Sequence, residues 1–131
     1  MKGIILALIL TSISTHVMAK WEQYAYMKDD GTSIYIDRST IRENRNIVRM
    51  WYLNDYKTMQ INPRYKFQST KGLTEFDCVD EKTRMLTFLH YTGNMGGGRV
   101  VHVNDEGPGI WEYIVPGSVY EILWLVACGK E

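Results

Sequence analysis

Apolar and polar residues alternate with a period of two along most of this chain, and this alternation constrains its fold more than any other feature. Successive side chains of a strand point to opposite faces of a sheet, so each alternating run indicates a strand. Such runs cover residues 21–28, 32–36, 47–53, 72–79, 82–91, 99–104 and 111–115. Short connections such as Asp29-Asp30-Gly31 favour antiparallel neighbours. We therefore predict an antiparallel meander of about six strands.

Two stretches between these runs give a weaker signal. Residues 37–46 are polar and typical of a turn. Residues 55–69 contain Pro63, which cannot donate a hydrogen bond to a neighbouring strand, so the fold of that segment stays open. Residues 47–53 carry apolar side chains on both faces, which indicates a central strand that is covered on both sides.

The first 19 residues have the features of a secretory leader. Lys2 supplies a positive start, residues 3–13 are mainly apolar, and Val17-Met18-Ala19 ends the segment with small residues at the positions that a leader peptidase requires. A membrane anchor needs about 20 apolar residues and is interrupted by His16. We predict a signal peptide over residues 1–19, a single domain over 20–131 and no transmembrane segment in the mature chain, which would be periplasmic or secreted, or displayed at the cell surface.

Export to an oxidising compartment would favour a disulfide between the two cysteines of the chain. Cys78 and Cys128 are the only pair, and two thiols of a small domain usually join in an oxidising compartment. A metal site would need further thiols or histidines, and a redox site would place the two cysteines close together in the sequence. We predict a structural disulfide between them.

The period changes from strand to helix at the C-terminus. Ser118 and Glu121 form a capping box before an apolar run, and Gly129 stands where a helix would stop. We expect one helix over residues 119–128, which makes the fold α+β. If Cys128 ties the helix to the sheet, the side that carries Trp124 and Leu125 packs on the sheet. The side that carries Val119, Ile122 and Val126 then needs another cover.

The charge balance excludes some classes of partner. The chain has 15 basic and 15 acidic residues and a formal net charge of zero. A protein that neutralises phosphates needs an excess of positive charge, so no nucleic-acid partner is expected. The same balance gives no general attraction to anionic lipid.

Candidate catalytic and metal-binding residues are few. His90 and His102 would lie opposite each other across a hairpin, but a metal site usually needs three or four ligands. The glycines at 96–98 lack the Lys-Ser/Thr of a phosphate-binding loop, and Asp29-Asp30-Gly31 lacks the later ligands of a calcium loop. Ser118 already has a capping role. We expect no enzyme activity, no cofactor and no metal.

Basic side chains are the remaining candidates for a binding site. Exposed arginines are frequent in protein recognition, although solvated strands and loops account for such residues equally well. The candidates are Arg42, Arg45, Arg49, Lys57, Arg64 and Lys66.

Several separate fragments together resemble the bacterial surface-adhesin protein E family, and the resemblance covers nearly the whole mature chain. The fragment with the most specific spacing is Ala127-Cys128-Gly129-Lys130 at the end, combined with Phe76-Asp77-Cys78 before it. The others are Asp37-x-x-Thr40-Ile41, Trp51-x-Leu53-x-Asp55-Tyr56, Arg84, Tyr91-x-Gly93-x-Met95-Gly96 before Val100-Val101, Pro116-Gly117-Ser118, and Trp124.

The resemblance implies a six-stranded antiparallel sheet whose concave face holds a C-terminal helix through a disulfide. It also implies a dimer that binds host matrix and plasma proteins at the cell surface. The family's adhesin is lipid-anchored, whereas no cysteine lies near Ala19 for such an anchor. The alternative is therefore a periplasmic envelope protein that binds a small ligand or a partner protein and has no adhesive role.

Self-association is expected on physical grounds as well. A single sheet with apolar residues on both faces has only one helix to cover them, and the side of the helix with Val119, Ile122 and Val126 is left over. A symmetric homodimer is the commonest way to bury such a surplus.

Overall fold

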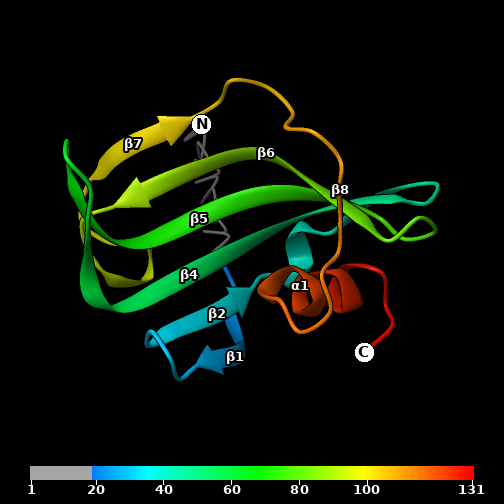
Figure 1. Ribbon diagram of the computed structural model, residues 1–131, viewed down its shortest axis with the longest axis horizontal. Helices are drawn as coiled ribbons and strands as arrows, with labels where there is room; N and C mark the ends of the chain where they lie inside the picture. Colours follow the sequence, from blue (N-terminus) through cyan, green and yellow to red (C-terminus); the bar gives the residue numbers. More distant parts are fainter. Residues whose placement is uncertain (1–18) are drawn as a thin grey trace, which may run out of the picture.

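The computed structural model describes residues 19–131 as a curved antiparallel sheet with one α-helix against it (Figure 1). The sheet consists of β1 (Glu22–Met27), β2 (Thr32–Ile36), β3 (Arg42–Asn44), β4 (Ile47–Ile61), β5 (Lys66–Asp77), β6 (Lys82–Tyr91), β7 (Val100–Asn104) and β8 (Glu112–Tyr113). The helices are α1 (Val119–Ala127) and two short 3₁₀ turns, η1 (Arg38–Thr40) and η2 (Asn94–Gly96).

The predicted leader, residues 1–19, lies outside the described residues except for Ala19. Its cleavage stays a prediction, as does the single domain over residues 20–131. Within residues 19–131 the structure has no helix that is both long and apolar enough to cross a membrane.

The strands form the predicted meander. Their order in the sheet is β1-β2-β4-β5-β6-β7, with β3 paired to β4 and β8 paired to β6. All pairs are antiparallel. The face of the sheet that α1 covers is called the helix face below, and the opposite face is called the back face. Alternation along β4 places Met50 and Tyr52 on the helix face and Arg49 and Trp51 on the back face.

The segment whose fold the sequence left open is the far half of a long hairpin. β4 and β5 continue through residues 55–61 and 66–69, with an irregularity in register between Asp55 and Gln60. Pro63 lies in the turn between these strands, where the Asn62 side chain accepts hydrogen bonds from the N–H groups of Arg64 and Tyr65. Because the proline stands outside the ladder, it does not interrupt the strands.

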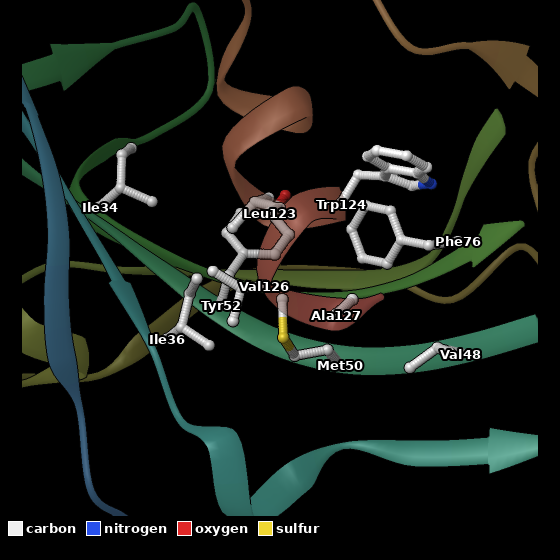
Figure 2. Packing of buried hydrophobic residues seen from close by; sticks show 10 residues of the cluster. All are labelled: Ile34, Ile36, Val48, Met50, Tyr52, Phe76, Leu123, Trp124, Val126 and Ala127. Atoms are coloured by element: carbon white, nitrogen blue, oxygen red, sulfur yellow. The ribbon is translucent and has the colours of Figure 1, made fainter. Parts of the chain in front are cut away.

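Helix α1 has the predicted cap and stop. The Ser118 side chain accepts a hydrogen bond from the Glu121 N–H at 3.4 Å, and Gly129 has a φ of 64°, the left-handed conformation that ends helices. Figure 2 shows the core that the helix forms with the sheet, with Trp124 beside Phe76 and Leu123 beside Tyr52. The buried apolar side chains of this core are Ile34, Ile36, Val48, Met50, Tyr52, Phe76, Leu123, Trp124, Val126 and Ala127.

The side of α1 that faces the sheet includes Trp124, as predicted, but otherwise differs from the prediction. Val126, which the sequence placed on the uncovered side, is only 3% exposed and belongs to the core, and Val119 packs against that core. Leu125, which was expected to face the sheet, is half-buried and packs against the core, as Val119 does. The prediction took Cys128 as the centre of the packed arc, but Cys128 lies at the edge of the arc that Leu123, Val126 and Ala127 define. The expected uncovered stripe on the helix is therefore wrong.

The predicted disulfide is present. Cys78, just after β5, is bonded to Cys128 at the end of α1 across 50 residues of sequence. Two hydrogen bonds accompany it: the Trp124 indole N–H donates to the Asp77 carbonyl at 3.0 Å, and the Lys130 ammonium donates to the Cys78 carbonyl at 3.3 Å. The end of α1 is thus held to the end of β5 by one covalent and two polar contacts.

One glycine permits a close approach inside the core. Gly72 on β5 faces Tyr52 across the sheet register, and a side chain at position 72 would place its Cβ 2.5 Å from the Tyr52 ring. The tyrosine ring therefore lies directly over the glycine backbone, where no other residue type leaves room for it.

Removal of the disulfide should destabilise the domain strongly. In the Cys78→Ala/Cys128→Ala variant we expect a loss of about 3–4 kcal/mol in the free energy of unfolding, because the unfolded chain regains the freedom of a loop of about 50 residues. Urea denaturation monitored by tryptophan fluorescence measures this, with the reduced wild-type protein as the control. Equal midpoints for the oxidised and reduced forms would contradict the structural role of the bond.

Candidate binding groove

The six basic residues that the sequence singled out are all exposed, but they lie in two separate groups. Arg42, Arg45 and Arg49 lie at the β3–β4 hairpin, and Arg45 has a φ of 58° in its turn. Lys57, Arg64 and Lys66 lie at the tip of the β4–β5 hairpin. A strand rises about 3.3 Å per residue, so the part of β4 between Arg49 and Lys57 separates the groups by more than about 20 Å. The six do not form one patch.

The sheet register extends the first group into a row of charges on the back face. Arg42 on β3 is paired with Arg49 on β4, and Arg49 is paired with Glu75 on β5. Glu75 is in turn paired with Arg84 on β6. Because these residues are directly opposite one another, the row places three positive charges and one negative charge side by side across four strands.

One end of this row is neutralised and rigid. Glu75 is only 9% exposed, and its carboxylate accepts from the Arg84 guanidinium at 2.8 Å and 3.0 Å. The Arg84 guanidinium also lies over the Trp111 ring, 4.6 Å from its centroid. The Arg84 guanidinium, which is bound to a buried carboxylate and covered by an aromatic ring, has little freedom to bind anything else.

The other end of the row is not neutralised. Among the residues that the structure describes, neither Arg42 nor Arg49 forms an ion pair with a carboxylate. Arg42 instead donates to the carbonyls of Ser39 and Ile41, both at 2.9 Å. Two like charges opposite each other in a sheet repel, and an anion placed between them relieves the repulsion.

A groove lies over this row. It has a volume of about 330 Å³ and is lined by the four charged residues of the row and by the apolar side chains of Trp111 and Ile47. Glu43, Asn44 and the edge of β3 complete its wall, so the charges that line it sum to +1. A second cavity of about 600 Å³ shares Arg42 and Arg49 and continues toward Trp51 and Asp37. We call the two together the arginine groove.

The residues of the arginine groove that were not among the predicted site residues include Glu75, Arg84 and Trp111. The sequence could have predicted the pairing of the first two. The tight turn between β5 and β6 pairs Asp77 with Lys82, and two residues farther from the turn on each strand Glu75 is paired with Arg84. Trp111 could not be placed in this way, since it comes from the connection that precedes β8.

A separate cavity, smaller than the two that form the arginine groove, lies between the helix face and the start of α1. Its volume is about 250 Å³, and its lining includes Tyr52, Asn54 and Tyr120. The Asn54 side-chain oxygen is buried without a hydrogen-bond partner among the described residues. Burial raises the pKa of the Tyr52 phenol well above its ordinary value, so this residue is neutral. The cavity is thus lined mainly by apolar and neutral polar groups.

The two histidines lie opposite each other, as expected from the hairpin. His90 and His102 are paired across β6 and β7, with ring centroids 5.7 Å apart. His90 stacks on Phe67 at 3.8 Å, and its Nδ1 is 2.8 Å from the Thr70 hydroxyl. Within residues 19–131 there is no group of three or more His, Cys, Asp or Glu side chains that could hold a metal ion. The pair belongs to a cluster of stacked rings.

The chain matches the family model of surface-adhesin protein E over residues 21–129. The chain belongs to the surface-adhesin protein E family. The match spans every strand and the helix of the structure, including both cysteines of the disulfide. The protein is therefore an adhesin-like domain, and its disulfide fits a location outside the cytoplasm. No curated protein matches the chain.

Solved structures of Haemophilus influenzae protein E share this fold. One crystal form is 13% identical, with a TM-score of 0.64, and the similarity covers 98% of this chain and 98% of that chain. The selenomethionine form is 14% identical, with a TM-score of 0.62, over 88% of this chain and 91% of that chain. At this level of identity the likeness concerns the fold.

The stability of the domain should decrease in mild acid because of His90. Burial, together with the positive charge of the neighbouring His102, lowers the pKa of His90 to about 4. In the unfolded chain a histidine titrates near 6.5, so between these values the unfolded state binds more protons. The free energy of unfolding is therefore at its full value above about pH 6.5 and falls as the pH is lowered toward 4.

Thermal unfolding at pH 7, 6, 5 and 4 tests this expectation. His90→Gln should flatten the decrease in Tm between pH 7 and 4. His102→Gln is the matched control and should leave most of it, because burial is the larger cause of the shift at His90. A wild-type Tm that does not change over this range would contradict the expectation.

Proposed function

We propose that this protein is an exported, non-catalytic binding domain that recognises an acidic segment of another protein through the arginine groove. The observation that carries the proposal is the Arg42–Arg49 pair. These two exposed, like-charged side chains lie opposite each other without an acidic partner among residues 19–131, beside a fixed Glu75–Arg84 pair. The partner would be an extracellular matrix protein or a protein of the cell envelope.

The chemistry of the groove favours carboxylates. A guanidinium presents donors in a planar fork that matches a carboxylate, and two of them side by side can bind two acidic residues of one peptide. Trp111 and Ile47 provide apolar surface along the same groove. Arginine and tryptophan are the residues that most often dominate the energy of protein interfaces. An acidic peptide with apolar side chains between its charges would use both parts.

A non-catalytic role is supported by the structural tasks of the residues that could have acted in catalysis. The Ser118 hydroxyl caps α1, and the Thr70 hydroxyl lies in hydrogen-bond distance of His90. In the glycine-rich loop, the Asn94 side chain and the Met95 N–H both donate to the Asp55 carboxylate, which holds the loop against β4. We infer that the protein acts in the periplasm or at the cell surface, in keeping with its family and its disulfide.

Charge reversal in the groove tests the proposal. We expect Arg42→Glu/Arg49→Glu to weaken binding to immobilised reconstituted extracellular matrix at least about tenfold, because each substitution replaces a favourable charge contact by a repulsive one. Surface plasmon resonance with residues 20–131 of the folded, oxidised chain measures the affinity.

The matched control is Lys57→Glu/Lys66→Glu, which makes the same change of net charge at the other end of the hairpin. This variant should bind the matrix as the wild type does. Equal loss in both variants would show that the attraction depends only on net charge, and absence of wild-type binding would overturn the adhesive function.

Small-molecule binding is the second candidate function. It is favoured by the cavity under α1, whose lining includes Asn54, a residue with a buried side-chain oxygen that has no hydrogen-bond partner among the described residues. The charge reversals on the back face distinguish the two candidates, because they leave this cavity unchanged. Wild-type affinity for the matrix in both charge-reversed variants would show that the arginine groove is not the matrix-binding surface.

We also propose that the mature protein forms a homodimer. An uncovered apolar side of α1, from which the sequence predicted a dimer, does not support it, because Val126 is in the core. The support comes from exposed apolar side chains at the β5–β6 turn and in residues 110–115, which lie beside the first half of β6. The Ile114 N–H donates to the Glu81 carbonyl and the Gly109 N–H donates to the Met85 carbonyl, and these bonds hold the segment there. These side chains are Val79, Ile110, Tyr113 and Val115, which are 64–78% exposed.

Light scattering after size exclusion at micromolar concentration should give a mass near two chains. Tyr113→Lys, a charge placed among the exposed apolar residues, should shift the mass to one chain, whereas Ile61→Lys at the far hairpin tip should not. A mass of one chain for the wild type, unchanged on concentrating, would contradict the homodimer.

A further inference from the structure

The backbone N–H of Lys20 donates a hydrogen bond to a buried carboxylate, that of Asp37. The nitrogen lies 3.0 Å from the Asp37 Oδ2, and Asp37, between β2 and η1, is only 3% exposed. Ala19 and Lys20 are themselves exposed, so the peptide bond between them lies at the surface. This is the bond that the leader pattern marks for cleavage.

Asp37 is held as a charged group. Its other oxygen accepts from the Ser39 N–H at 3.0 Å and from the Ser39 hydroxyl at 2.5 Å, and in this way it caps η1. Burial alone would raise the pKa of the Asp37 carboxyl. The hydrogen bonds from Ser39 and Lys20, with the charge of Lys20, outweigh this and hold the pKa below its ordinary value. A buried carboxylate that stays ionised favours a positive partner.

The turn that Asp37 caps also builds one wall of the arginine groove. The Thr40 hydroxyl donates to the Asp37 carbonyl at 2.6 Å and accepts from the Trp51 N–H at 3.0 Å. On this edge of β4, β3 pairs with the residues up to Arg49 and β2 pairs with the residues from Tyr52 on. The Trp51 N–H lies between these two segments, so the Thr40 hydroxyl takes the place of a strand as its acceptor. The same turn provides the Ser39 carbonyl that binds Arg42. Asp37, η1 and Arg42 thus form one connected unit.

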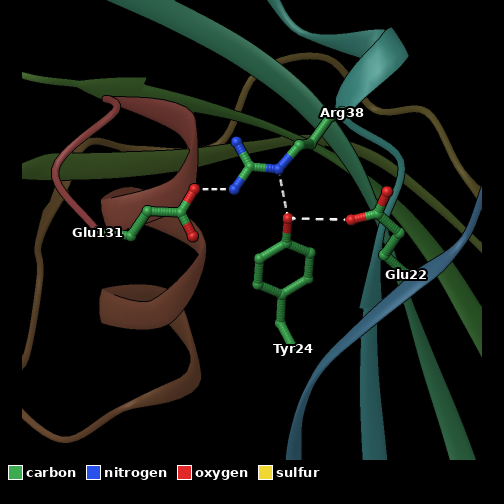
Figure 3. A network of polar contacts seen from close by, with 4 residues as sticks. All are labelled: Glu22, Tyr24, Arg38 and Glu131. Atoms are coloured by element: carbon green, nitrogen blue, oxygen red, sulfur yellow. Dashed lines mark hydrogen bonds and ion pairs between the residues drawn. The ribbon is translucent and has the colours of Figure 1, made fainter.

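Contacts of the Arg38 side chain also hold η1 in place. Figure 3 shows Arg38 between the Tyr24 hydroxyl and the Glu131 carboxylate, with Glu22 beyond the tyrosine. The ion pair joins η1 to the last residue of the chain. Arg38 thus pairs with Glu131, and among residues 19–131 no basic side chain forms a salt bridge with Asp37.

We propose that Asp37 is the binding site for the α-ammonium group that leader cleavage creates at Lys20. A leader peptidase adds water across the Ala19–Lys20 bond: Ala19 leaves with a new carboxylate, and the Lys20 nitrogen becomes an ammonium group. That nitrogen is already placed against Asp37, so cleavage replaces a hydrogen bond from an uncharged amide by an ion pair without moving the chain. The inference rests on the proposed function only for its consequence in binding, because the unit of Asp37, η1 and Arg42 that the ion pair stabilises contributes Arg42 to the arginine groove.

Cleavage would also change the groove directly. Ala19 is part of the lining of the cavity that Arg42 and Arg49 share with Asp37. Its departure opens that end of the cavity. The uncleaved precursor would therefore have both a weaker η1 turn and an obstructed groove, so that the groove is completed only in the processed protein.

The test compares proteins that differ by one residue. One begins at Lys20 and the other retains Ala19, and both are released from a fusion by a protease that leaves no extra residue. Each is made with Asp37 and with Asp37→Asn, which keeps the size of the side chain and still caps a helical turn well. The measurements are the Tm at pH 7 and the exchange rate of the Thr40 and Ile41 amides.

With Asp37, the form that begins at Lys20 should have the higher Tm, by about 4 °C, and slower exchange at both amides. With Asp37→Asn the two forms should have the same Tm. Equal Tm values in the Asp37 background, or a difference that persists in Asp37→Asn, would overturn the inference. An intact mass of the exported protein that does not begin at Lys20 would also overturn it.

These outcomes are independent of the proposed function, because none of them requires a ligand. If the Tm difference is found and the matrix does not bind, only the binding function fails. If the matrix binds and the Tm values are equal, only the role of the ammonium group fails.

Discussion

The position of the helix depends on the disulfide between Cys78 and Cys128. A helix of nine residues has little stability of its own in water, so α1 exists because it is tethered and because its buried side packs on the sheet. The bond joins the last turn of the helix to the end of β5, and Trp124 and Lys130 add hydrogen bonds to the same strand end. With the helix fixed there, Leu123 and Val126 close the core over the central strands.

The two faces of the sheet have different tasks as a result. The helix face is buried and apolar, and the close contact of Tyr52 with Gly72 shows how little space is left there. The back face carries charges in register, because the strands that align the core residues also align the residues between them. The same pairing that places Met50 under the helix places Arg49 between Arg42 and Glu75. The geometry of the groove is therefore a consequence of the packing on the opposite face.

Much of the fold could be predicted from the sequence, because alternation, turn residues and a capping box are local signals. The meander, the helix and the disulfide all follow from them. β3 could not be predicted, since Arg42–Asn44 is exposed throughout and has no apolar alternation. The extension of β4 past Asp55 was hidden by Pro63, which is in the turn. The site was predictable only in part: arginines can be identified in a sequence, but which of them meet across strands is decided by register, as the pairing of Arg42 with Arg49 shows.

The late position of α1 in the chain affects how the protein can fold during export. Four of the ten buried apolar residues of the core come from the helix, between positions 123 and 127. A chain that emerges from its N-terminus can pair its strands early, but Ile34, Met50 and Phe76 stay exposed to water until α1 has followed them. Closure of the core therefore waits for α1. Since Cys78 bonds to a cysteine that emerges 50 residues after it, formation of the disulfide waits for the same segment.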